Sequence, residues 1–317
     1  MQRPQIPVQD HDERDGIRVS VAELRRLRGK ASSLGMPPPG ILSSLFPGAF
    51  RARYHGRGLE FLESRPYQAG DDFRSLDWRV TARSGRLHTK LFQEEREQRL
   101  FLLLDAGLSM HFGSRNAFKW VVAARLAGLV AWLALNRGDR LGCLLFGTSL
   151  DVPLHPPTTG ETALNRLFQQ LAGIDRSWAT TADLEAALRQ LRALIPPGSL
   201  VLILSDFMQP AARWRAQLTA LAQYNELAAI TLYDPLEADL PLAGRLPISD
   251  GQRVLQIDAG DPLLRQRYRQ AFDQRLREVA APFQRHRGVC FAIGTQQDAV
   301  AMLRKRLHLP VGHRHAG

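Results

Sequence analysis

Short apolar runs alternate with longer stretches of helical periodicity from residue 99 to residue 306. Strands are predicted near residues 99–105, 140–147, 199–206, 227–233 and 288–293. Helices are predicted near residues 115–136, 160–172, 182–194, 211–224, 262–286 and 297–306. Continuous apolar strands that alternate with helices are typical of sheets that are covered on both faces. We therefore expect an α/β fold with a doubly wound, mostly parallel sheet of the Rossmann type.

The chain before residue 99 has a different pattern. Residues 48–98 combine frequent glycines with dense charge and short alternating segments at 58–62 and 87–92, which predict an antiparallel β-ribbon with turns at 70–72 and 84–85. Residues 19–34 have the spacing of one short amphipathic helix. The expected parts are a mobile segment with a short helix (1–47), the ribbon (48–98), the α/β domain (99–310) and a disordered tail (311–317).

Composition limits the class of protein. Hydrophobic residues form 44% of the 317 residues, enough for a core, and the two cysteines cannot form a disulfide framework. The start of the chain lacks the pattern of a signal peptide, and its longest apolar stretch, 126–135, is too short to span a membrane. We therefore expect a soluble cytoplasmic protein.

The formal net charge of +11 is most concentrated near the C-terminus. The predicted helix 262–286 contains a row of arginines: Arg265, Arg267, Arg269, Arg275 and Arg277. Such a row forms either a solvated helix face or a docking surface for an acidic partner.

Two predicted strands end in an aspartate, Asp105 in RLFLLLD and Asp206 in SLVLILSD. In parallel sheets, ligands bind beyond the carboxyl ends of the strands. Ser109 follows Asp105 by four residues, and Thr181 lies just before a predicted helix. These oxygen ligands would suit Mg²⁺. Strand-end aspartates also cap helices and close loops, so spacing alone leaves both interpretations open.

The order of these residues resembles the von Willebrand factor A-type domain. Its metal-ion-dependent adhesion site has the pattern Asp-x-Ser-x-Ser with a distal Thr and Asp. The resemblance implies that Asp105, Ser109, Thr181 and Asp206 occupy the metal-site positions. Gly107 replaces the middle serine, and the threonine is displaced by one residue relative to its helix. We therefore expect a degenerate metal site.

The segment before Asp105 is similar to the signature of a bacterial family called domain of unknown function 58. The similarity rests on the sequences GRGLEF from residue 56, RPY from 65, GDDFR from 70, DW from 77, TAR from 81 and EERE from 94. It implies an adaptor or co-chaperone that works with a MoxR-type AAA+ ATPase, often beside other von Willebrand-type proteins, in assembling or activating protein complexes.

The same segment offers candidate residues for binding a partner, because aromatic and arginine side chains are enriched at interfaces. These candidates are Arg65, Tyr67, Asp71, Asp72, Arg74, Asp77, Trp78 and Arg83. The alternative interpretation is a scaffold in which Arg–Asp pairs hold the turns of the ribbon and the aromatic rings form a small core.

Three functions follow from these patterns. The first is a non-enzymatic protein-interaction module. The second is a metal-dependent phosphoesterase or hydrolase that uses Asp105, although the phosphatase pattern needs a second aspartate where this chain has Gly107. The third is nucleic-acid binding through the basic C-terminal helix. We expect no nucleotide, haem or zinc site, because the chain lacks a phosphate-binding loop and zinc-ligand spacing.

Overall fold

The computed structural model describes residues 16–34, 59–68, 71–94, 99–149, 155–242, 244–249 and 254–307. The predictions for residues 1–15, for the turn at Gly70 and for the tail 311–317 lie outside this part of the chain. Contacts divide the chain into a ribbon unit, Ala52–Glu97, and an α/β unit that comprises Met1–Arg51 and Gln98–Gly317. The α/β unit therefore includes the N-terminal helix, which the sequence placed in a separate part.

The α/β unit contains a six-stranded sheet with the order β10-β7-β6-β3-β4-β5. Its strands are β3 (Arg99–Asp105), β4 (Arg140–Phe146), β5 (His155–Thr158), β6 (Leu200–Ser205), β7 (Glu226–Tyr233) and β10 (Val289–Gly294). All neighbours pair in parallel except β4 and β5. The expected α/β class with a mainly parallel sheet is confirmed. The edge strand β5 was missed because its sequence, HPPT, is short and has two prolines.

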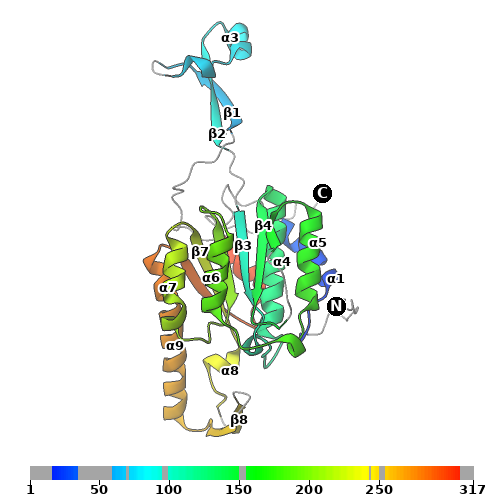
Figure 1. Ribbon diagram of the computed structural model, residues 1–317, viewed down its shortest axis with the longest axis vertical. Coiled ribbons are helices and arrows are strands. Elements are labelled where there is room, and N and C mark those ends of the chain that lie inside the picture. The colour runs from blue at the N-terminus through cyan, green and yellow to red at the C-terminus, as the bar shows by residue number, and fades with distance from the viewer. Residues whose placement is uncertain are drawn as a thin grey trace. The chain divides into compact units, whose positions relative to one another are not determined.

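Helices cover both faces of this sheet (Figure 1). One face carries α1 (Val21–Ser33), α4 (Lys119–Arg137), α5 (Glu161–Gly173) and α10 (Ala299–Leu307). The other face carries α6 (Leu184–Leu194), α7 (Ala211–Ala222) and α9 (Pro262–Arg285). Each face of the sheet has its own apolar core. Successive side chains of strand β3 alternate between them: Leu102 packs in the core of the first face and Leu103 in the core of the second.

Helix α4 is the most buried helix of the first face. Its length and apolar composition are those of a candidate membrane span, but 83% of that window is buried inside the α/β unit. The helix α1 packs against it, and the Trp132 indole donates to the backbone oxygen of Leu24 at 2.9 Å. Leu24 and Leu27 crowd Gly128 of α4, where a Cβ would lie 3.0 Å from Leu24. Burial by α1, α5 and the sheet explains why this helix is apolar around most of its surface.

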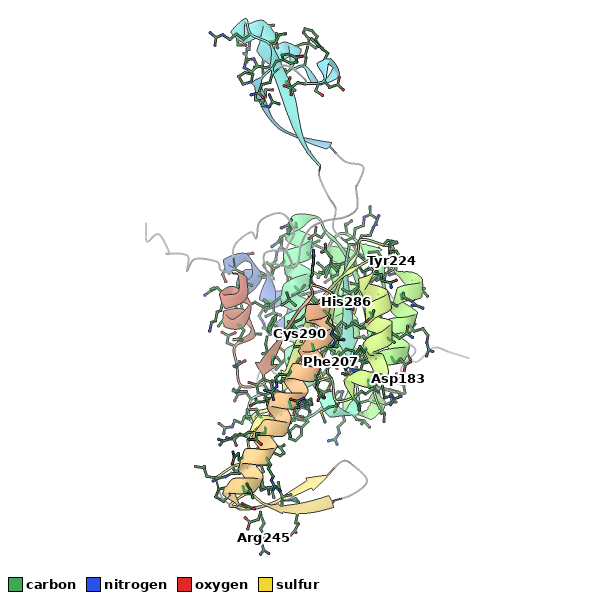
Figure 2. The ribbon with its side chains drawn as sticks, turned by 90° about the vertical axis from the view of Figure 1, so that its left-hand side faces the viewer. Asp183, Phe207, Tyr224, Arg245, His286 and Cys290 are labelled. Carbon is green, nitrogen blue, oxygen red and sulfur yellow. The ribbon has the colours of Figure 1, made fainter. Side chains whose placement is uncertain are left out.

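An arm extends past the carboxyl edge of the sheet (Figures 1 and 2). It consists of α8 (Pro235–Ala238), the antiparallel pair β8 (Arg245–Ser249) and β9 (Val254–Asp258), and the first half of α9. Figure 2 shows Arg245 at the far end of this arm. The first residue of α9 that is buried in the core is Val279, and the residues before it are half-buried or exposed.

The ribbon unit pairs β1 (Leu59–Pro66) with β2 (His88–Glu94) in antiparallel register, with Arg65 opposite Thr89. The connection between them holds a short 3-10 turn, η1 (Phe73–Ser75), and the helix α3 (Trp78–Ser84). The sequence predicted a turn at 84–85. There Gly85 ends α3 in the left-handed conformation, with φ of 68°.

Candidate functional site

Asp105 ends the central strand β3 and is buried. Its Oδ2 accepts a hydrogen bond from Ser205 Oγ at 2.6 Å, and its Oδ1 accepts from the Gly107 backbone N–H at 2.8 Å. Burial, followed by the negative charge of Asp206, raises the pKa of Asp105 from 3.8 to about 7. The structure therefore brings the two strand-end aspartates together, as the sequence predicted.

Asp206 follows β6 and contacts a cation supplied by the chain itself. The Lys119 ammonium donates to Asp206 Oδ2 at 2.8 Å and to Glu237 Oε1 of α8 at 2.6 Å, and the lysine side chain is completely buried. Burial alone would lower the pKa of Lys119, but the charges of Asp206 and Glu237 raise it above its ordinary value. Lys119 is therefore a charged ammonium inside the site.

Lys119 lies where a lysine is otherwise unfavourable. It is the first residue of α4, where the helix dipole is positive, and it has no exposed surface. Only nearby carboxylates make such a position tolerable. The sequence signal was a single lysine at the start of an apolar helix, and the pattern of strand-end aspartates does not point to it.

Asp234 extends the polar network to the next two strands. It follows β7, has no exposed surface and accepts hydrogen bonds from Ser114 N and Oγ, Leu236 N and Thr295 Oγ1. Its backbone N–H donates to Glu237 Oε2 at 2.8 Å, which links it to Lys119. Burial would raise the pKa of Asp234, but the hydrogen bonds from Ser114, Leu236 and Thr295 lower it.

The remaining predicted metal ligands, Ser109 and Thr181, are not part of this buried polar network. Ser109 is half-buried on the 3-10 turn η2 (Leu108–Met110), and Thr181 is exposed. The segment that contains Thr181 does approach the loop after β3, since Leu108 N donates to the Thr180 backbone oxygen at 3.0 Å. However, the side chain that faces Gly107 belongs to Ala182.

These residues are a poor fit for Mg²⁺. A hydroxyl is missing at Gly107, Thr181 faces solvent, and a buried ammonium already contacts Asp206. In the part of the chain that the structure describes, no group of three or more His, Cys, Asp or Glu residues is arranged to hold a metal ion. The predicted Mg²⁺ therefore stays a prediction, and the contacts of Lys119 argue against it.

Packing at Gly107 explains the missing hydroxyl and gives a testable prediction. A Cβ there would lie 2.9 Å from Ala182 Cβ and 3.0 Å from Asp105 Oδ1. We expect Gly107→Ala to lower the free energy of unfolding by about 1–3 kcal/mol. The control is Gly29→Ala on α1, where nothing lies within 4 Å and a gain of about 0.5–1 kcal/mol is expected. Urea unfolding measures both, and equal effects would contradict the clash.

The loops around this buried network expose large apolar side chains. They follow β3, β6 and β7 or precede α6, and the exposed residues are Leu108, Phe112, Trp178, Met208 and Leu236. Met208 is 51% exposed although it lies two residues beyond the buried Asp206. The loop from Asp206 also holds the neighbouring segment, because Gln209 Oε1 accepts from Leu184 N at 3.1 Å. The edge is thus a hydrogen-bonded polar layer with exposed apolar side chains.

The ribbon unit separates its candidate residues into two groups. Asp71 pairs with Arg65 at 2.7 Å, and Asp77 is buried, caps α3 and accepts from Ser64 Oγ. Hydrogen bonds from Gln68 N and Arg65 lower the pKa of Asp71. These three residues form the scaffold that was one of the two interpretations of the sequence. Tyr67 supports it, with its ring 5.3 Å from that of Phe73.

Of the other candidate residues, Asp72, Trp78 and Arg83 are exposed. Trp78 is 67% exposed and Phe73 is 65% exposed, and both precede or begin α3. Three arginines are exposed on α3 and just after it: Arg79, Arg83 and Arg86. Asp72 is exposed as well, while the side chain of Arg74 lies outside the described part. We name the set Phe73, Trp78, Arg79, Arg83 and Arg86 the ribbon face.

Comparisons with known proteins identify relatives without assigning an activity. A family model described as "Protein of unknown function DUF58" matches residues 63–278. An uncharacterized protein of Mycobacterium bovis is 30% identical over 248 residues, which cover 78% of each chain. An uncharacterized protein of Bacillus subtilis, YeaD, is 33% identical over 108 residues, or 34% of this chain and 25% of that protein.

Among solved structures, a conserved hypothetical protein BatB from Bacteroides thetaiotaomicron is 12% identical to this chain. The match covers 67% of this chain and 97% of that one, with a TM-score of 0.41. A structural similarity with so low a TM-score gives no information about function.

Proposed function

This chain belongs to the DUF58 family of proteins of unknown function, and we propose that it is a non-enzymatic protein-interaction module. The observation that carries this proposal is the carboxyl edge of the sheet. There, Asp105, Asp206 and Asp234 are held by internal donors, while large apolar side chains of the same loops face solvent. A fixed layer that exposes apolar groups suits recognition of a partner.

We propose further that the α/β unit is a von Willebrand factor A-like domain that works in the cytoplasm. Support comes from the position of Asp105 at the end of a central strand and from the neighbouring loops that carry Ser109, Thr181 and Asp206. The sequence resemblance supplies the partner: a MoxR-type AAA+ ATPase, together with other von Willebrand-type proteins, in the assembly or activation of protein complexes.

The ribbon face is the second contact surface of this proposal. It combines two exposed aromatic rings with three exposed arginines, and tryptophan and arginine are the residue types most often found at binding hot spots. The partner surface it fits is acidic and has apolar groups for Phe73 and Trp78.

A binding assay with the purified MoxR-type ATPase tests the function. We expect Leu108→Asp at the edge and Trp78→Ala on the ribbon face each to weaken binding by about 30-fold, because each removes about 2 kcal/mol of interface energy. The matched control is Tyr224→Ala, an aromatic residue that is 54% exposed and follows α7 near the start of β6 (Figure 2). Unchanged binding of both variants, with melting temperatures like that of the wild type, would contradict the proposal.

The alternative functions have weaker support. A nucleophilic Asp105 would have to be ionised and free, but both of its oxygens accept hydrogen bonds and its pKa is raised to about 7. Two of the arginines of α9 contact their own arm: Arg269 pairs with Asp239 at 2.6 Å, and Arg265 donates to the Leu242 backbone oxygen. Side chains used in this way are less available to phosphates of a nucleic acid.

A further inference from the structure

We propose that the Lys119 ammonium is the resident cation of the carboxyl edge, so that this site holds its carboxylates together without a divalent metal ion. The inference rests on the proposed function only in taking this edge as the place where a partner binds. It adds that binding there needs no metal, unlike binding at the metal-ion-dependent adhesion site that the sequence resembles.

The first step of the inference is the position of the Lys119 ammonium beside Asp206 and Glu237. Its Nζ is 2.8 Å from Asp206 Oδ2 and 2.6 Å from Glu237 Oε1, which are charge-assisted distances, and the side chain has no exposed surface. The ammonium joins the loop after β6 to α8 through Asp206 and Glu237, which are 31 residues apart in the sequence. A metal ion bound to Asp206 would therefore lie beside a fixed positive charge and be strongly repelled.

The second step of the inference concerns the groups that hold the carboxylates of the site. The ammonium contacts the carboxylates of Asp206 and Glu237, while Asp105 is held by the Ser205 hydroxyl and the Gly107 backbone N–H. Both oxygens of Asp105 thus already accept hydrogen bonds from donors within the fold. The lysine and these internal donors together take the place that a divalent ion has in other sites.

Removal of the ammonium should then open a metal site. Lys119→Met keeps a side chain of similar length but leaves Asp206 and Glu237 buried or half-buried with no cation between them. The carboxylate oxygens of Asp206 and Glu237 that contact the ammonium in the wild type are ligands that Mg²⁺ and Mn²⁺ prefer, and water can complete the coordination shell. Mn²⁺ is the probe of choice, since its binding is measured directly by electron paramagnetic resonance.

The experiment titrates Mn²⁺ into wild type, Lys119→Met and Arg125→Met, and records melting temperatures with Mn²⁺ and with EDTA. Arg125 is the matched control, because it lies on the same helix and pairs with Glu23 at 2.5 Å on the side of α1. We expect no effect of Mn²⁺ or EDTA on wild type or Arg125→Met. Lys119→Met should bind Mn²⁺ at least about tenfold more tightly than wild type and melt at a higher temperature with it.

Two results would overturn the inference: stoichiometric Mn²⁺ binding by wild type with a lower melting temperature in EDTA, or a folded Lys119→Met that binds Mn²⁺ no better than wild type. If Lys119→Met does not fold in either condition, the wild-type titration decides alone. None of these measurements uses a partner, so a failure here is distinct from a failure of the ATPase-binding assay.

Discussion

Replacing Asp234 by alanine is expected to lower the free energy of unfolding by about 3–5 kcal/mol. The carboxylate accepts four hydrogen bonds from three separate segments: Ser114 N and Oγ, Leu236 N and Thr295 Oγ1. Its loss leaves these donors without an acceptor at a site with no exposed surface. It also frees α8, whose Glu237 holds the Lys119 ammonium.

Urea unfolding measures this effect. The matched control is Asp239→Ala, because Asp239 lies five residues further on and its side-chain ion pair with Arg269 is about half exposed. An exposed pair of this kind contributes at most about 1 kcal/mol. If Asp234→Ala were no more destabilising than Asp239→Ala, the buried network would not be what holds the loops at this edge together.

Replacing Asp105 by asparagine is expected to remove a pH dependence of stability. Burial and the charge of Asp206 raise the pKa of Asp105 from 3.8 to about 7, so the folded protein binds a proton more tightly than the unfolded chain. The contribution of Asp105 to the free energy of unfolding therefore falls as pH rises from about 4 to about 7. Asparagine has the same shape and does not ionise, so Asp105→Asn should gain relative to wild type across this window, by up to about 4 kcal/mol.

The measurement is the difference in unfolding free energy between Asp105→Asn and wild type, taken at steps from about pH 4 to about pH 8. The control is Asp239→Asn, whose carboxylate has a pKa lowered by the hydrogen bond from Arg269 and stays ionised over most of this range. A difference for Asp105→Asn that is constant with pH would show that the carboxyl group is ionised throughout.

The periodicity of the sequence was sufficient for the central strands and the long helices of the α/β unit. The runs that end in Asp105 and Asp206 are buried on both faces, so the hydrophobic effect alone makes them apolar along their whole length. Edge elements were harder to predict. The strand β5 and the pair β8–β9 bury little surface, and their sequences, such as HPPT, carry almost no periodic signal.

In the ribbon unit, the pattern of charged and aromatic residues did not predict which side chains are buried and which are exposed. The sequence placed eight candidate residues there as one set, because arginine, aspartate and aromatic residues alternate in it. The structure separates them by burial: Asp77 caps α3, while Trp78, the next residue, is 67% exposed. Neighbours in the sequence point in different directions on a helix, and the pattern of residue types does not show which one the fold covers.

The sequence by itself determined the class of fold and the meeting of Asp105 and Asp206 at one edge, because parallel strands that end in the same layer deliver their next residues to the same place. Only the tertiary structure decided what neutralises these carboxylates. Lys119, Asp206 and Glu237 are separated by 87 and 31 residues along the chain, and no local pattern of hydrophobic and polar positions relates them. Their contact depends on the packing of α4 and α8 against the ends of the strands, which places a buried ammonium beside Asp206.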